Sequence, residues 1–206
     1  LYSVDIATEY YLDKSKAVGY IADAHYIEGT HPRWHKLPGK DISDCIATIG
    51  AGIDFAILDT SHSLPGELLS FFALLPFLTE KAELILHDIS LPILYRRNDP
   101  DRTKDHPLRG ACTPLLFYAL WSDKKYCSDA EVPNCGAVTI DKETVLQNAV
   151  HLVNMLHLNW NSLPPPRVLM QTQAIVEQYY PKTVVALYKE AVAYNLWIRG
   201  VRIEQH

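Results

Sequence analysis

The sequence has no long hydrophobic run and no leader that resembles a secretion signal. None of its apolar stretches approaches the roughly 20 residues that a membrane-spanning helix needs, and the opening residues are too few and, with Asp5, too polar for a signal peptide. The chain also has no internal repeat and no low-complexity tract. These absences predict a globular cytoplasmic protein that does not associate with membranes.

The cysteines follow none of the common scaffold patterns. The chain has four, none of them in a CxxC pair, at positions 45, 112, 127 and 135. Their spacing is not that of a zinc site, and four in 206 residues do not make a disulfide framework. Cys127 and Cys135 flank a loop and would be able to bridge in an exported protein, but we expect reduced thiols. The net charge of −5 argues against a nucleic-acid partner.

Polar residues follow two predicted strands in the middle of the chain. The first strand, Ile53–Leu58, is apolar and rich in branched residues, which predicts burial on both faces in a parallel sheet. Gly66–Leu78 has the spacing of a crossover helix, and Glu83–Leu86 is the second strand. Ligands bind at the carboxyl ends of such strands. We therefore expect one rim to carry Asp59, His62, His87 and Asp88.

The segments before this stretch predict further alternation of strands and helices. Leu1–Ile6 reads as a strand ending near Asp5, and Trp34–Leu37 as a short strand. Asp41 is the expected N-cap of a helix that ends before Gly50. A carboxylate after a strand or at a helix start in such a fold is also able to contact a ligand.

The later segments predict a change of organisation. Residues 90–105 are charged and without period, which predicts a surface loop. Helices are expected at 112–121, 141–160, 168–180 and 182–197, and a strand at 134–140. These elements predict that the chain is divided into an α/β domain over residues 1–140 and a helical extension over residues 141–206 that packs on it. The extension would also be able to cover an acceptor or form a homodimer.

In this order, the motifs resemble the second half of a class I S-adenosylmethionine-dependent methyltransferase. IDFAILDTSH (53–62) and AELILHDIS (82–90) are similar to the fourth and fifth strands of that fold, and PNCGAV (133–138) to a later one. The branch most similar to this chain comprises small-molecule O-methyltransferases, including enzymes that act on sugars. The resemblance implies a Rossmann-like, mostly parallel sheet with flanking helices, S-adenosylmethionine as cofactor and a small hydroxylated acceptor.

The resemblance also implies roles for individual residues. Asp5 would hold the ribose of the methyl donor, and Asp41 would lie near its adenine. Asp59 would lie close to the reacting methyl group of the donor or bind a metal ion. Asp88 would join it as a second carboxylate on magnesium, but Ile89 stands where the metal-dependent relatives carry an acid or amide.

The chemistry of methyl transfer to oxygen explains why such residues are needed. The attacking hydroxyl is a weak nucleophile until a base takes its proton or a metal lowers its pKa. His62 and His87 are the candidate bases, since the unperturbed pKa of histidine is about 6.5. As metal ligands they would favour manganese, iron or zinc. The alternatives are structural: a helix cap for Asp59, a turn residue for His62 and a supporting group for His87.

One element of the resemblance is missing from the sequence. No strand with a glycine-rich loop, which cradles the methionine part of the donor, stands before Leu1. We expect either that such residues precede Leu1 or that the donor pocket has been lost. Two alternatives to the methyltransferase therefore stay open. One is a non-catalytic module with a methyltransferase-like fold, and the other is a metal-dependent hydrolase or hydroxylase-like enzyme that uses the rim residues directly.

Overall fold

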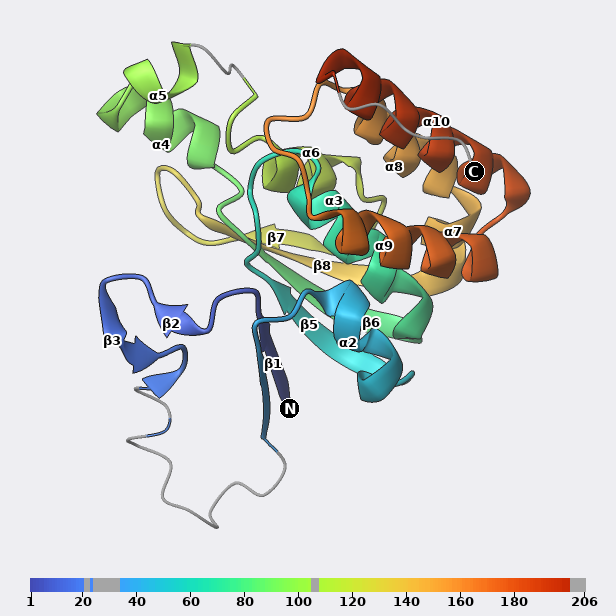
Figure 1. Cartoon of the computed structure of the whole chain (residues 1–206), viewed down its shortest axis with the longest axis horizontal. Helices are drawn as coiled ribbons and strands as arrows, with labels where there is room; N and C mark the ends of the chain where they lie inside the picture. The colour runs from blue at the N-terminus through green and yellow to red at the C-terminus, as the bar shows by residue number, and fades with distance from the viewer. Residues whose placement is uncertain (21–22, 24–33, 105–107, 201–206) are drawn as a thin grey trace. The chain divides into compact units, whose positions relative to one another are not determined.

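The computed structural model describes residues 1–20, 23, 34–104 and 108–200. The chain forms two compact units, Leu1–Gly50 and Ala51–His206. Each unit is described by itself below. Figure 1 shows the chain with its elements labelled.

The first unit combines two small sheets and a helix. Strand β1 (Tyr2–Asp5) pairs in parallel with β4 (His35–Pro38), and both lie where the sequence predicts strands. Strands β2 (Glu9–Tyr10) and β3 (Asp13–Ala17) form an antiparallel pair. Helix α2 (Ile42–Ile49) closes the unit.

Helix α2 begins as the sequence predicts, because Asp41 caps it. The Asp41 carboxylate accepts a hydrogen bond from the Ser43 amide at 2.9 Å. The Asp44 carboxylate accepts one from the Asp41 amide at 2.8 Å, which completes a capping box. Gly50 ends the helix with φ of 82°, in the left-handed region that glycine tolerates best.

The second unit is built on a four-stranded mixed sheet. Its strands are β5 (Ile53–Leu58), β6 (Leu78–His87), β7 (Lys125–Cys127) and β8 (Cys135–Asp141), in the spatial order β5-β6-β8-β7. Strands β5 and β6 are parallel, whereas β8 is antiparallel to both β6 and β7. The predicted α/β class is confirmed in this coarse form. A single Rossmann-like, mostly parallel sheet stays a prediction.

Helices cover one face of this sheet and supply the core. They are α3 (Gly66–Leu74) with a 3-10 turn at Leu75–Phe77, α6 (Cys112–Ala119), α7 (Lys142–Gln147), α8 (Ala149–Asn154) with a 3-10 turn at Met155–His157, α9 (Pro166–Tyr179) and α10 (Lys182–Ile198). Figure 1 shows α3, α9 and α10 gathered on one side of the sheet. Leu84, Leu86, Val138 and Ile140 point into this core and are fully buried. Helix α3 is buried along nearly its whole length, as its apolar sequence requires.

Strand β5 differs from its prediction of burial on both faces. It is the edge strand of its sheet, and the side chains of Phe55 and Ile57 are 50% and 59% exposed, while that of Leu58 is buried. The apolar run identified the strand correctly but did not show that the strand lies at the edge of its sheet with some of its side chains exposed. Sequence reports the polarity of a strand, not how many of its faces are covered.

Two further segments differ from their predictions. The expected surface loop at 90–105 contains α4 (Leu91–Asn98) and α5 (Asp101–Lys104), and its last residue lies outside the described part. Helix α4 has no fully buried residue, and its half-buried apolar residues Leu91, Leu94 and Tyr95 span little more than one turn before the charged residues begin. The single helix expected at 141–160 is interrupted at Asn148, whose side-chain amide donates to the Thr144 carbonyl at 2.8 Å. Across the described residues, no helix has both the length and the apolar character to span a bilayer.

Candidate functional site

A tight loop after β5 sets the position of His62. Asp59 directly follows the strand, and α3 begins only seven residues later, at Gly66. A Cβ on Gly66 would lie 2.1 Å from the Ser61 carbonyl oxygen, so only glycine fits this close approach. The His62 carbonyl accepts a hydrogen bond from the Cys112 amide at the start of α6, at 3.0 Å. The loop therefore folds back over the start of α3.

The end of β6 carries a backbone irregularity of its own. His87 is the last residue of the strand, and Asp88 has φ of 62°, which is uncommon for a residue other than glycine. In an extended strand, neighbouring side chains point to opposite faces. The left-handed conformation of Asp88 breaks that alternation, so that His87 and Asp88 both reach the loop after β5. Such outliers occur where a site requires them.

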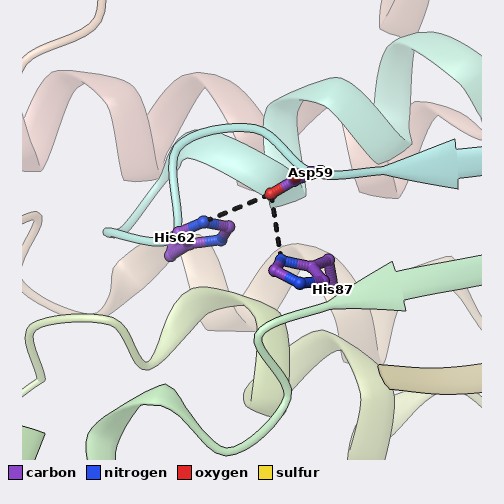
Figure 2. Close-up of side chains that lie close together, drawn as sticks. All are labelled: Asp59, His62 and His87. Carbon is purple, nitrogen blue, oxygen red and sulfur yellow. Dashed lines mark ion pairs between the residues drawn. The ribbon is translucent and has the colours of Figure 1, made fainter. Parts of the chain in front are cut away.

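Four side chains from these two strand ends meet; we call Asp59, His62, His87 and Asp88 the rim cluster. Asp59 Oδ1 lies 3.5 Å from His62 Nε2 and 3.2 Å from His87 Nδ1, and Figure 2 shows both rings turned toward that carboxylate. Asp88 lies 3.1 Å from His62 Nε2 through Oδ2 and 3.4 Å from His87 Nδ1 through Oδ1. The structure thus brings together the residues expected at one rim, while their roles stay predictions.

Behind the rim cluster lies a carboxylate that the sequence reasoning missed. Glu67 is fully buried, and its Oε1 lies 2.8 Å from His62 Nδ1 and 3.4 Å from the Thr60 amide. Thr113 Oγ1 lies 3.2 Å from the same histidine nitrogen. A carboxylate at Nδ1 accepts a hydrogen bond from the N–H group there and leaves Nε2 to face the rim. Glu67 therefore fixes both the orientation and the tautomer of His62.

The carboxylates around His62 change its protonation. Burial alone would lower the pKa of His62, but the hydrogen bond to Glu67 and the charges of Glu67, Asp88 and Asp59 outweigh burial and raise it above 6.5. His62 therefore keeps its second proton to a higher pH than a free histidine does. In that state, its two N–H groups point to Glu67 and Asp88.

Several buried polar atoms around this point have no hydrogen-bond partner among the described residues. They are Glu67 Oε2, His87 Nδ1 and Asn134 Oδ1. Asn134 reaches the site from the turn before β8, with its side-chain nitrogen 3.0 Å from His87 Nε2. Buried polar groups are nearly always paired in native proteins. Three of the six such atoms in the described residues lie around this one cluster, which makes it a candidate binding place.

The rim cluster has the donor atoms of a metal site. Asp59, His62 and His87 each offer one ligand atom, and these atoms all lie within 4.8 Å of one another. The resemblance implies magnesium, which takes oxygen ligands in near-ideal octahedral geometry. Two imidazole nitrogens beside one carboxylate do not fit that preference and suit a borderline transition metal instead.

One cysteine near the site, Cys112, is inert. Cys112 is fully buried, and burial together with the nearby charge of Glu67 raises the pKa of its thiol far above the usual range. It is therefore neither a nucleophile nor a thiolate ligand at neutral pH. Two hollows of about 430 and 480 Å³ lie elsewhere in the second unit, and no residue of the rim cluster lines either of them.

The two remaining predicted site residues, Asp5 and Asp41, belong to the first unit. Asp5 ends β1 and is exposed, and its Oδ1 accepts a hydrogen bond from the Ala7 amide at 2.8 Å. Asp41 is the helix cap described above. Both local arrangements are those of turn and cap residues, and their roles toward a methyl donor stay predictions.

A signal for Glu67 was present in the sequence, as the one charge in the apolar passage from Leu64 to Leu78. Asn134 had a weaker signal, because it opens the predicted strand after a proline. Thr113 had none beyond its place at a helix start.

Comparisons with models of protein families, with curated proteins and with solved structures find no match to this chain.

Proposed function

We propose that this protein is an S-adenosylmethionine-dependent O-methyltransferase that acts on a small hydroxylated acceptor, such as a sugar. The observation that carries the proposal is the position of the rim cluster at the carboxyl ends of two adjacent parallel strands, β5 and β6. That edge is where α/β folds bind their ligands. It is also where the resemblance places the acceptor and the reacting methyl group.

The topology of the second unit supports the same proposal. The resemblance assigns β5 and β6 to the fourth and fifth strands of the methyltransferase fold and β8 to a later one. Strand β8 runs antiparallel between β6 and β7, so the last strand in the chain is not the last in the sheet. The parallel pairing of β5 with β6, joined through α3, is what the assignment of these two strands requires.

The side chains present suit activation of a hydroxyl group. In the proposed reaction, the acceptor oxygen attacks the methyl carbon of the sulfonium, the carbon–sulfur bond breaks, and its electron pair stays on sulfur. The hydroxyl proton has to leave, and the rim cluster offers His62 Nε2 and His87 Nδ1 as nitrogens that face the edge. Glu67 holds the ring of His62 in place for this task.

Two measurements on the purified chain test the proposal. Calorimetric titration with S-adenosylmethionine should give saturable binding that weakens at least tenfold in Asp5→Asn. Asp123→Asn, a change at an exposed loop position, is the matched control. A methyl-transfer assay by mass spectrometry over a panel of sugars and other hydroxylated acceptors should lose about 10²–10⁴-fold in rate in His62→Ala. Donor binding should survive that change.

The outcomes separate the proposal from its alternatives. Saturable donor binding without transfer to any acceptor would favour a non-catalytic module with the same fold. Absence of donor binding up to millimolar concentration would contradict the methyltransferase.

A second candidate is favoured by the carboxylate and two imidazoles of the rim cluster. This arrangement also occurs in hydrolase or hydroxylase-like enzymes that use a metal directly. Metal-dependent turnover of an ester or of an oxidisable substrate, without methyl donor, would support that class. Activity that persists in chelator would reject it.

A further inference from the structure

We infer that the rim cluster binds one transition-metal ion of the zinc, manganese or iron class, and not magnesium, with Asp59 Oδ1, His62 Nε2 and His87 Nδ1 as protein ligands. The inference concerns ion binding alone and does not depend on the proposed methyl transfer. The resemblance implies magnesium held by the carboxylates of Asp59 and Asp88. The inferred site differs in the ion and in its ligands, because two histidines bind the ion together with Asp59.

The distances between the three atoms match those of a coordination sphere. Zinc binds imidazole nitrogen and carboxylate oxygen at about 2.0–2.2 Å, so two ligands of a tetrahedral ion stand roughly 3.4 Å apart. Asp59 Oδ1 lies 3.5 Å from His62 Nε2 and 3.2 Å from His87 Nδ1. Both distances from the carboxylate therefore match those around a tetrahedral ion, and all three ligand atoms lie within 4.8 Å of one another.

One imidazole is held at the nitrogen that faces away from the proposed ion, because the Glu67 carboxylate lies 2.8 Å from His62 Nδ1. Metal-binding histidines almost always have such an acceptor at the second nitrogen, which fixes the ring and raises its basicity. At His87 Nε2 the side-chain nitrogen of Asn134 lies at 3.0 Å, and an amide nitrogen only donates. Binding of the ion through His87 Nδ1 therefore requires this amide to turn and present Oδ1, which has no partner among the described residues, to the Nε2–H group.

The polar groups left unpaired point to the same place. His87 Nδ1 is buried and has no hydrogen-bond partner among the described residues, although it faces the carboxylates of Asp59 and Asp88. Glu67, Asp59 and Asp88 together bring three carboxylates to two imidazoles. A divalent cation would bind this nitrogen and balance the negative charge of the carboxylates.

The donor types decide which ion is preferred. Magnesium is a hard cation that dehydrates reluctantly and favours carboxylate and water oxygen. Imidazole suits zinc, iron and other first-row ions, whose affinity for nitrogen ligands is much greater. Such an ion lowers the pKa of a bound hydroxyl or water. The same residues would then serve hydroxyl activation through the ion instead of through a free histidine base.

Calorimetry on the chelator-treated, desalted chain tests the inference. Separate titrations with Zn²⁺, Mn²⁺ and Mg²⁺ should give one site per chain, with Zn²⁺ at least 100-fold tighter than Mg²⁺. Substitution by Co²⁺ should give visible d–d absorption bands that report nitrogen ligands in a low-symmetry site. His62→Ala and Asp59→Ala should each lower Zn²⁺ affinity at least 100-fold and remove the bands. His151→Ala removes an exposed histidine on α8 and should change neither.

Glu67→Gln provides a variant that keeps the shape of the site. Loss of a group that orients a metal-binding histidine typically costs 10–100-fold in affinity, so Zn²⁺ binding should weaken by that factor with an unchanged circular dichroism spectrum. Equal affinity for Mg²⁺ and Zn²⁺, no binding below 1 mM, or the same loss in His151→Ala as in His62→Ala would each overturn the inference. Donor binding is measured separately, so failure here leaves the proposed function standing.

Discussion

Buried polar groups behave differently in two regions of the second unit. In the helical layer, Asn195 donates to the Leu156 and Ala191 carbonyls and accepts from the Trp160 amide, and the Tyr180 and Tyr188 hydroxyls donate to backbone carbonyls. At the strand ends, charged and ring groups share contacts, and three of their atoms have no partner among the described residues.

The difference separates stability from binding. A neutral amide or hydroxyl that meets only backbone groups contributes to folding and leaves nothing for a ligand. Like charges placed side by side, such as the carboxylates of Glu67, Asp59 and Asp88, lower stability unless a cation or a protonated histidine lies among them. Gln171 and Thr172 on α9, and Asn161 in the loop before it, also each have an unpaired oxygen, but these three groups are neutral and offer no charge to a cation. Charge, more than burial itself, distinguishes the rim.

The largest expected loss of stability comes from the helical layer. Asn195→Ala removes three hydrogen bonds and leaves the Trp160 amide buried without a partner, so the free energy of unfolding should fall by about 3 kcal/mol. Urea denaturation followed by circular dichroism measures this. Zn²⁺ affinity should not change below the transition. Asn154→Ala, an exposed change at the end of α8, is the control and should cost little. A loss below about 1 kcal/mol would contradict the assignment of a structural role.

The second effect has the opposite sign and comes from the rim. An ion that binds only the folded chain stabilises it by about 2.7 kcal/mol when its free concentration is 100 times its dissociation constant. Zn²⁺ at that concentration should therefore raise the thermal midpoint of the chain. His62→Ala should show almost no shift. An equal shift in both proteins would place the stabilising ion elsewhere.

The third effect links the two regions, because one substitution should disturb both stability and binding. Gly66→Ala puts a Cβ 2.1 Å from the Ser61 carbonyl oxygen, so the loop before α3 must move, at about 1–3 kcal/mol. Zn²⁺ affinity should fall as well, because that loop positions His62. Gly136→Ala places a Cβ 2.5 Å from the Phe117 ring and should destabilise by a similar amount with a smaller effect on Zn²⁺. Unchanged Zn²⁺ affinity in Gly66→Ala would show that the loop is not what holds His62.

The sequence was sufficient to predict most elements and the meeting of the four rim residues. Apolar runs located β5, β6 and β8, and their polar ends located Asp59 and His87. The sequence did not predict α4, because its apolar residues Leu91, Leu94 and Tyr95 span little more than one turn, too short a stretch to establish a helical period within a charged segment. Glu67 was missed for a related reason: its partner is set by how the Gly66 loop folds back, which depends on a contact with the Ser61 carbonyl and not on a motif.

The smallest expected effect is a pH dependence of stability that separates the rim from the helical layer without any ion. The carboxylates of Glu67, Asp88 and Asp59 raise the pKa of His62 in the folded chain above 6.5. A raised pKa means that the folded state binds the proton more tightly than the unfolded state does. His62 therefore contributes its full stabilisation below pH 6.5 and loses it as the pH rises through the higher folded value of its pKa.

In chelator, unfolding by urea should need less denaturant at pH 8.5 than at pH 6, and His62→Gln should reduce that difference. Asn195→Ala should keep it, because no titrating group contacts Asn195 among its hydrogen bonds in the described residues. Equal pH dependence in the wild-type chain and His62→Gln would show that the charges at the rim do not act on this histidine as the geometry indicates.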